Sequence, residues 1–248
     1  MQQQIFILDI VALGEFSSIH AIETIRTFLN RQDIIKIVWD GRMDSIECRY
    51  TLHARLRSVL DLQVAEVLSR ESILQQGERQ RLERLVRGQF GYSIVRKNRG
   101  LLKGLNLVLG LQACLDEQGI VGFPKDPEVV ELHRQNRSQI WMDRPLPASL
   151  LQYAANDIYM ISQLFQRFRR NGTLPRAKAD RDCLIKQSEN YILRCGLPGR
   201  VDKNNSFRPR SVLMVHALRE RHAPISTVKL AALSFPLNVS IHPAAPQG

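Results

Sequence analysis

A tyrosine and an aspartate stand one helical turn apart in the most regular segment of the chain. Residues 147–169 repeat apolar side chains at alternating steps of three and four, which predicts one long helix. At about 100° per residue, Tyr153 and Asp157 share one flank beside the apolar stripe. A phenol and a carboxylate placed together can serve a common site; the alternative is an edge tyrosine and a solvated aspartate. The stripe itself comprises Leu151, Ala154, Ile158, Ile161, Phe165 and Phe168.

A second candidate group is the basic segment between residues 79 and 103. Cationic side chains neutralise phosphates and aromatic rings stack on unpaired bases, so this segment could bind single-stranded nucleic acid. The alternative is a solvated helix followed by a basic loop. The candidate binding residues are Arg84, Arg87, Phe90, Tyr92, Arg96, Lys97, Arg99 and Lys103.

The elements that must position these groups alternate between strands and helices. Two β-rich apolar runs, residues 5–11 and 34–39, flank a helix predicted over 18–30, and this order is typical of a βαβ unit in a parallel or mixed sheet. The second run ends in a turn at Asp40 and Gly41. Beyond it the patterns predict a helix at 44–55, a short strand at 58–62, helices over 64–87 interrupted at Gly77, a helix opening at Pro127, and weaker helices near 180–195 and 211–221.

Composition places the chain among ordinary globular proteins. It has 248 residues, of which 44% are hydrophobic and 24% charged, with a formal net charge of +11. No apolar stretch approaches the roughly 18 residues of a membrane span, and the first residues lack the basic leader of a signal peptide. Four scattered cysteines without a CxxC pair argue against a disulfide framework and a structural zinc site. They favour a cytoplasmic or nuclear protein.

The excess positive charge is concentrated toward the carboxyl end. Residues 171–248 contain 12 Lys and Arg against 5 Asp and Glu, whereas residues 1–170 contain 23 against 19. A basic balance favours polyanionic partners, but a basic tail or a solvated surface explains it equally well. We therefore expect residues 171–248 to form a basic, loosely structured extension of a domain over residues 1–170.

The helix with Tyr153 and Asp157 resembles the third motif of the DEDD superfamily of 3′–5′ exonucleases, in its Tyr-containing branch. The spelling Tyr-Ala-Ala-x-Asp is the family's, and a Trp-x-x-Arg-Pro-Leu lead-in precedes it at 141–146. Residues 36–44, which end in Asp44, resemble the second motif. Two further segments have counterparts in the family: residues 59–65 follow the second motif, and residues 101–106 match a short Leu-rich helix. The order of motifs is most similar to that of RNase D-like proteins near the Egalitarian-type branch.

The resemblance implies an α/β, RNase H-like fold with a mixed sheet flanked by helices. It also implies phosphodiester hydrolysis with two divalent cations, Mg²⁺ or Mn²⁺, held by four carboxylates. By resemblance, Asp157 binds the metal on the nucleophile side, Asp44 supports the second metal, and Tyr153 orients the attacking water. These three side chains should converge in one cleft, with the two carboxylates within roughly 8 Å of each other.

The chain departs from the family at the first motif, Asp-x-Glu, which supplies two of the four carboxylates. Asp9 has no Glu two residues on, and its surroundings resemble the family's third strand, so we expect it to be structural. The domain is then expected to be truncated at its N-terminus. Two functions follow as alternatives: a 3′–5′ exonuclease domain acting on single-stranded nucleic acid, RNA favoured, or a catalytically inactive RNA-binding adaptor derived from that fold. A purely structural interaction domain is a third.

Overall fold

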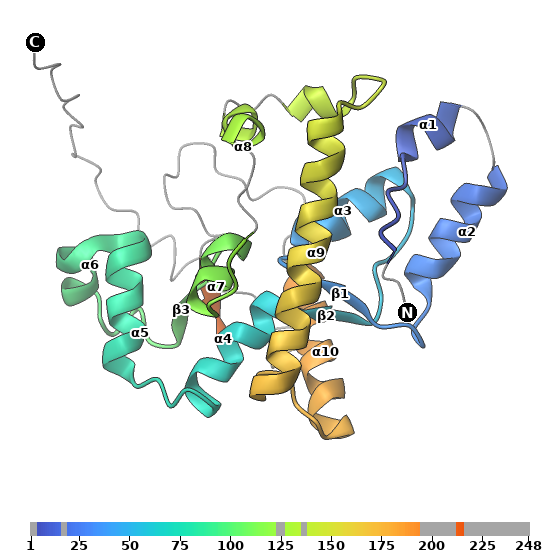
Figure 1. Cartoon of the computed structure of the whole chain (residues 1–248). Helices are drawn as coiled ribbons and strands as arrows, with labels where there is room; N and C mark the ends of the chain where they lie inside the picture. The colour runs from blue at the N-terminus through green and yellow to red at the C-terminus, as the bar shows by residue number, and fades with distance from the viewer. Residues whose placement is uncertain (1–3, 16–18, 123–126, 135–137, 194–211, 216–248) are drawn as a thin grey trace, which may run out of the picture.

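The computed structural model describes residues 4–15, 19–122, 127–134, 138–193 and 212–215 (Figure 1). The α-helices are α1 (Ile10–Glu15), α2 (Ile19–Asn30), α3 (Arg42–Thr51), α4 (Leu62–Ser72), α5 (Glu78–Leu85), α6 (Gly91–Lys97), α7 (Leu111–Glu117), α8 (Pro127–Arg134), α9 (Ala148–Asn171) and α10 (Lys178–Leu193). The strands are β1 (Lys36–Val38), β2 (Val59–Asp61), β3 (Leu105–Leu107) and β4 (Val212–Met214). A π-helical turn, η1 (Val86–Phe90), joins α5 to α6, and a 3₁₀ turn, η2 (Ser138–Trp141), precedes α9.

Strands β1 and β2 form a parallel pair, as the alternation of strands and helices predicted. Lys36 lies opposite Val59 and Val38 opposite Asp61. Their β-branched and aliphatic residues suit a strand covered on both faces, and all three residues of β2 are buried. Helix α10 lies against β2, and α9 contacts β1 (Figure 1). The predicted strands at 34–39 and 58–62 are therefore confirmed.

The predicted strand over residues 5–11 is wrong. Residues 4–9 form no regular secondary structure and belong to neither sheet, and helix α1 begins at Ile10. Asp9 determines this boundary, because its Oδ1 accepts a hydrogen bond from the Ala12 N–H at 3.1 Å and its backbone carbonyl accepts one from the Leu13 N–H at 2.9 Å. An N-cap of this kind starts a helix, so the chain turns helical at the residue after Asp9.

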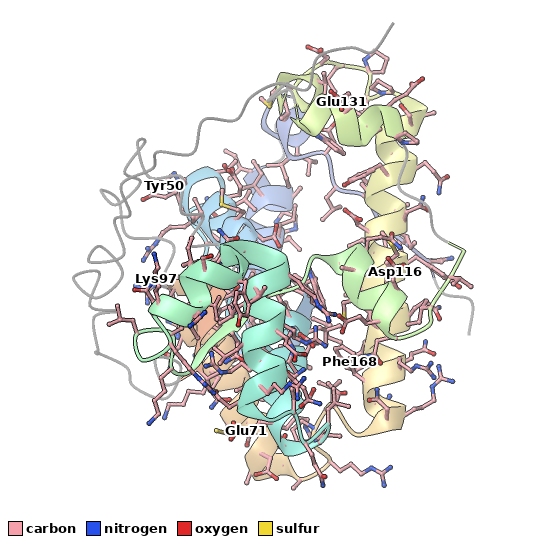
Figure 2. The ribbon with its side chains drawn as sticks, turned by 90° about the vertical axis from the view of Figure 1, so that its left-hand side faces the viewer. Tyr50, Glu71, Lys97, Asp116, Glu131 and Phe168 are labelled. Atoms are coloured by element: carbon pink, nitrogen blue, oxygen red, sulfur yellow. The ribbon has the colours of Figure 1, made fainter. Side chains whose placement is uncertain are left out.

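Two apolar clusters hold the described residues together. The main core lies between the β1–β2 pair and helices α4, α7, α9 and α10, and Figure 2 shows Phe168 pointing from α9 into it. A smaller cluster is enclosed by α5, η1, α6 and β3. We call residues 78–107 the α5–α6 unit. The side chains at the centre of the small cluster are Leu82, Leu85, Phe90, Val95, Leu102 and Leu105.

Helix α10 belongs to the main core, which corrects the predicted domain boundary. Leu184, Tyr191 and Ile192 are buried in the same cluster as β2 and α9. The helix near 180–195 is confirmed, but it is not part of a loose extension. Its apolar spacing is weak because its buried side also carries polar groups, among them Ser188. The rest of the predicted extension, residues 194–211 and 216–248, lies outside the described residues.

The segment expected to form a short Leu-rich helix instead contains β3. Leu105–Leu107 pairs in antiparallel fashion with Val212–Met214, where a weak helix was predicted. Leu105 belongs to the small cluster and Leu213 to the main core, so the β3–β4 pair connects the two clusters. Tertiary packing has overridden a helical leucine spacing here. None of the described helices has the length and apolar character needed to cross a lipid bilayer.

Candidate functional site

Tyr153 and Asp157 lie in line with the buried residues of α9. Leu150, Met160, Leu164 and Phe168 are the buried side chains of this helix. Tyr153 and Asp157 fill the intervening positions at steps of three and four, and both are half-buried. The pair therefore lies on the packed side of α9, and the buried Oδ1 of Asp157 argues against a fully solvated aspartate.

The predicted apolar stripe of α9 is rotated from the observed one. Leu151 and Ile158, two members of the predicted stripe, are 37% and 53% exposed, whereas Phe168, another member, is fully buried. A long helix with apolar residues on more than one side leaves its orientation to the neighbours that pack against it. Here these neighbours are α4, α7, α8 and β1.

The segment before α9 is anchored to the N-terminal part of the chain. Both Arg144 nitrogens Nε and Nη2 donate to the Asp9 carboxylate, at 2.6 and 2.7 Å. Arg144 Nη1 also donates to the carbonyl of Trp141 at 2.8 Å. The Trp141 ring stands edge-on to the Tyr153 ring, with 6.4 Å between centroids. Asp9 is thus a structural ion-pair partner, as predicted, and the Arg144 pair holds Trp141 against Tyr153.

A buried aspartate fixes the turn that carries Asp44. The carboxylate of Asp61 accepts from the backbone N–H of Asp40 at 3.1 Å and of Gly41 at 3.0 Å. It also caps α4 by accepting from the Gln63 N–H at 2.9 Å. Asp40 has φ of 54°, and a Cβ added at Gly41 would lie 2.8 Å from Val38 Cγ2. The turn is tight, and Asp61 is the group that determines its shape.

Asp44 lies in the first turn of α3, close to the carboxyl end of β1. Desolvation by the surrounding protein raises its pKa, and the negative charges of Asp40 and Glu47 raise it further. The side chain nevertheless keeps contact with solvent. Helix α9 contacts β1, the strand that leads into the turn before Asp44. The convergence of Asp44 and Asp157 within roughly 8 Å remains a prediction.

The described residues do not by themselves fit a two-metal centre. Within the described ranges, no group of three or more His, Cys, Asp or Glu side chains lies close enough to hold a metal ion. Two Mg²⁺ or Mn²⁺ ions need more oxygen ligands than Asp44 and Asp157 provide.

The α5–α6 unit presents most of the predicted nucleic-acid-binding residues at its surface. Tyr92 is 69% exposed, and Lys97 lies on the outer surface of the unit (Figure 2). No salt bridge joins the exposed cations of this surface to a carboxylate within the described part of the chain. We call this set the basic surface: Arg87, Tyr92, Arg96, Lys97, Arg99 and Lys103.

Two of the predicted binding residues have structural roles instead. Phe90 is 7% exposed and packs in the small apolar cluster, so it cannot stack on a base. The guanidinium of Arg84 donates to both carboxylate oxygens of Glu117, at 2.8 and 2.9 Å. Sequence spacing could not reveal these roles, because Glu117 is 33 residues away and Phe90 is buried by packing within the unit.

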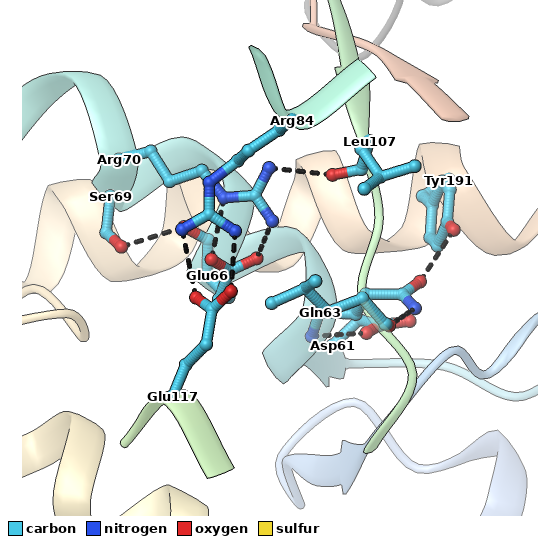
Figure 3. Close-up of polar contacts among 10 residues, drawn as sticks. Asp61, Gln63, Glu66, Ser69, Arg70, Arg84, Leu107, Glu117 and Tyr191 are labelled. Atoms are coloured by element: carbon cyan, nitrogen blue, oxygen red, sulfur yellow. Dashed lines mark hydrogen bonds and ion pairs between the residues drawn. The ribbon is translucent and has the colours of Figure 1, made fainter. Parts of the chain in front are cut away.

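An ion-pair network connects the α5–α6 unit to the main core (Figure 3). Glu66 on α4 accepts two hydrogen bonds from Arg70, at 2.7 and 2.6 Å, and both side chains are almost fully buried. Arg70 Nη1 also donates to the Leu107 carbonyl on β3 at 2.7 Å. Arg84 and Glu117 lie beside this pair and line a cleft of about 390 Å³. The network fixes where the basic surface sits relative to the core.

The sequence reasoning missed several residues that support the site. Arg42 is buried beneath the turn, with its guanidinium 4.7 Å from the centre of the Tyr191 ring. The Tyr191 hydroxyl donates to Gln63 Oε1 at 2.8 Å. The role of Asp61 could have been predicted from the sequence, because an aspartate between a strand and a helix is a typical N-cap. No local pattern could have predicted the role of Tyr191, because it lies on a helix 128 residues away from Gln63.

Comparisons with known proteins identify the fold. No protein-family model matches the sequence, and no curated protein matches it significantly. Among solved structures, the crystal structure of Trypanosoma brucei RNase D is similar to this chain, with a TM-score of 0.53 at 18% identity. The match covers 80% of this chain and 57% of that chain, so this chain spans little more than half of that RNase D. The mixed α/β architecture is therefore an RNase D-like exonuclease fold.

Proposed function

We propose that this chain is a 3′–5′ exonuclease-like domain that binds single-stranded nucleic acid, with RNA favoured, through its basic surface. The observation that carries the proposal is a set of exposed cations around an exposed tyrosine. Exposed cations neutralise backbone phosphates, and Tyr92 offers a ring on which a base can stack. RNase D as a structural neighbour supports RNA as the ligand.

The basic surface should give binding that falls steeply with salt. We expect fluorescence anisotropy with a labelled single-stranded RNA to show a linear loss of log affinity with log salt concentration. We expect weaker binding from a quadruple variant with Arg96→Ala, Lys97→Ala, Arg99→Ala and Lys103→Ala. Its affinity should fall at least about tenfold, and the slope of log affinity against log salt concentration should become shallower by roughly two to three.

A charge-matched control separates a specific surface from net charge. The same number of exposed cations can be removed outside the basic surface, by alanine at Arg170, Arg176, Lys178 and Lys186, of which Lys178 pairs with Asp182. This control should keep most of the wild-type affinity. If both variants lose the same affinity for single-stranded RNA, binding depends only on net charge, and the proposal is contradicted. Tyr92→Ala should weaken single-strand binding by about 1–3 kcal/mol, and Tyr92→Phe should restore it.

Hydrolysis is the second candidate, favoured by Tyr153 and Asp157 on the packed side of α9. It would use Mg²⁺ or Mn²⁺ with Asp44 and Asp157 among the ligands, and it needs more ligands than the described residues provide. A 5′-labelled single-stranded RNA incubated with either cation should then yield a ladder that shortens from the 3′ end. Asp157→Asn should abolish the ladder while leaving anisotropy unchanged. If no products form at stoichiometric protein, hydrolysis is contradicted and nucleic-acid binding remains as the proposed function.

A further inference from the structure

The cleft beside the ion-pair network is lined by residues of α5, η1 and β3. Its volume of about 390 Å³ lies within the range of roughly 300–1,000 Å³ that is typical of small-molecule sites. Its polar lining includes Gln76, just before α5, Gln80 in the first turn of that helix, and Arg87 in η1. Its apolar lining is formed by Leu107 and Leu109, which are half-buried. We call this space the α5–β3 cleft. Apolar atoms beside amide groups suit a flat ring whose rim forms hydrogen bonds.

Gly88 allows η1 to pack directly against β3 in this cleft. A Cβ added at Gly88 would lie 2.4 Å from Leu107 Cδ2, so any larger residue would displace the leucine. The absence of a side chain at this position therefore preserves the apolar part of the lining.

The carboxylates that line the cleft are neutralised by arginines. Glu83 pairs with Arg79 at 2.9 Å, and Glu117 accepts two hydrogen bonds from Arg84, at 2.8 and 2.9 Å. Arg87 is exposed and adds a positive charge. A polyanionic strand that approaches the cleft therefore meets no excess of negative charge.

The α5–β3 cleft adjoins the basic surface. Arg87 belongs to both. The pKa of Glu78, the first residue of α5, is lowered mainly by its hydrogen bond to Arg81. The positive charges of Arg99 and Lys103 lower this pKa further, so these two cations of the basic surface lie near the start of α5. A strand whose phosphates contact the basic surface can therefore place one base in the cleft.

We propose that the α5–β3 cleft binds one unpaired adenine base of a single-stranded nucleic acid held on the basic surface. The inference rests on the proposed function and adds a base preference to it. A glutamine amide pairs with adenine in two hydrogen bonds, because it donates to N7 and accepts from the N6 amino group. Guanine offers two acceptors, which suit an arginine fork, but the guanidinium of Arg84 already donates twice to Glu117.

Gln76 is the residue that reads the base. It is half-buried, and its backbone N–H donates to the Arg70 carbonyl at 2.8 Å, which fixes its position beside the buried ion pair. Gln80 is less suited to this role, because its Oε1 accepts a hydrogen bond from the Gly77 N–H at 2.8 Å and caps α5. Gln76 is therefore a specificity-determining residue of the proposed RNA-binding function.

Fluorescence anisotropy with labelled uridine oligomers tests the inference. The oligomers carry one central adenosine, guanosine or uridine and are otherwise identical. The wild-type protein should bind the adenosine strand about fivefold or more tightly than the other two. Purine riboside, which lacks the N6 amino group, and 7-deazaadenosine, which lacks N7, should each remove this preference when they replace the adenosine.

The variant Gln76→Ala should bind all strands with the affinity of the all-uridine strand and keep the wild-type dependence on salt. As a matched control, Gln152→Ala removes an exposed amide on α9, outside the cleft, and should keep the preference for adenosine. If the wild type does not prefer the adenosine strand, or if the preference survives Gln76→Ala, the inference is overturned while the proposed function stands. If no strand shows salt-dependent binding, the proposed function is overturned and this inference with it.

Discussion

Glu66→Ala should lower the free energy of unfolding by roughly 3–5 kcal/mol. The carboxylate is the bidentate partner of Arg70, and the two side chains are 5% and 3% exposed. Without Glu66, the Arg70 guanidinium stays buried with the Leu107 carbonyl as its remaining partner in Figure 3. Removing one partner of a buried pair costs more than the pair contributes, because the remaining charge is uncompensated. Chemical denaturation followed by circular dichroism measures the change.

A matched control uses the same substitution in an exposed pair. Glu83 pairs with Arg79 at 2.9 Å on α5, one turn apart, and both side chains face solvent. Glu83→Ala should therefore cost about 0.5 kcal/mol or less. A double variant, Glu66→Leu with Arg70→Met, replaces the ion pair by apolar groups and should recover much of the lost stability. Equal effects at Glu66 and Glu83 would show that burial of the pair is immaterial.

Asp61 should make the fold less stable as the pH rises from about 4 to above 6. Burial raises the pKa of Asp61 to about 6, while the N–H groups of Gly41, Asp40 and Gln63 act in the opposite direction. An unfolded chain releases this proton near pH 4, so the native state holds more protons across the window. Stability then decreases with rising pH, by up to roughly 3 kcal/mol for a shift of two units.

The variant Asp61→Asn isolates this titration. Asparagine cannot ionise, so the difference in unfolding free energy between wild type and variant should shrink across the window as the wild type loses stability. Below pH 4 the variant should be less stable, because its amide nitrogen cannot accept the hydrogen bond from the Gly41 N–H. Denaturation curves at intervals from pH 4 to 7 test the slope. A difference that grows with pH would mean that the three N–H donors keep Asp61 ionised throughout.

Local patterns in the sequence were sufficient for most helices and for the parallel strand pair. The extent of α9, the interruption at Gly77 and the Pro127 start all have signals within a few residues, and the structure confirms them, although the buried side of α9 differs from the predicted stripe. The motif resemblance also pointed to the RNase D-like fold that the structure comparison shows.

The errors arose where a residue's environment comes from distant segments. Residues 5–11 have the composition of a covered strand, yet no strand pairs with them among the described residues. Phe90 looked like a stacking residue because sequence cannot show that α5 and α6 enclose it. The weak helix near 180–195 seemed peripheral because its packing partners lie more than 120 residues earlier. The meeting of Asp44 with Asp157 is likewise a long-range property and stays a prediction.

The contact between α10 and β2 affects the order in which parts of the chain can fold. The Ser58 N–H donates to Glu189 Oε1 at 2.7 Å, and the Asp61 N–H donates to Ser188 Oγ at 3.1 Å, across 131 and 127 residues. Contacts this far apart slow folding, because a long loop must close first. During synthesis, the outer side of β2 stays unprotected until α10 has left the ribosome. A nascent chain therefore cannot complete the core around β2 before residues 178–193 have been synthesised.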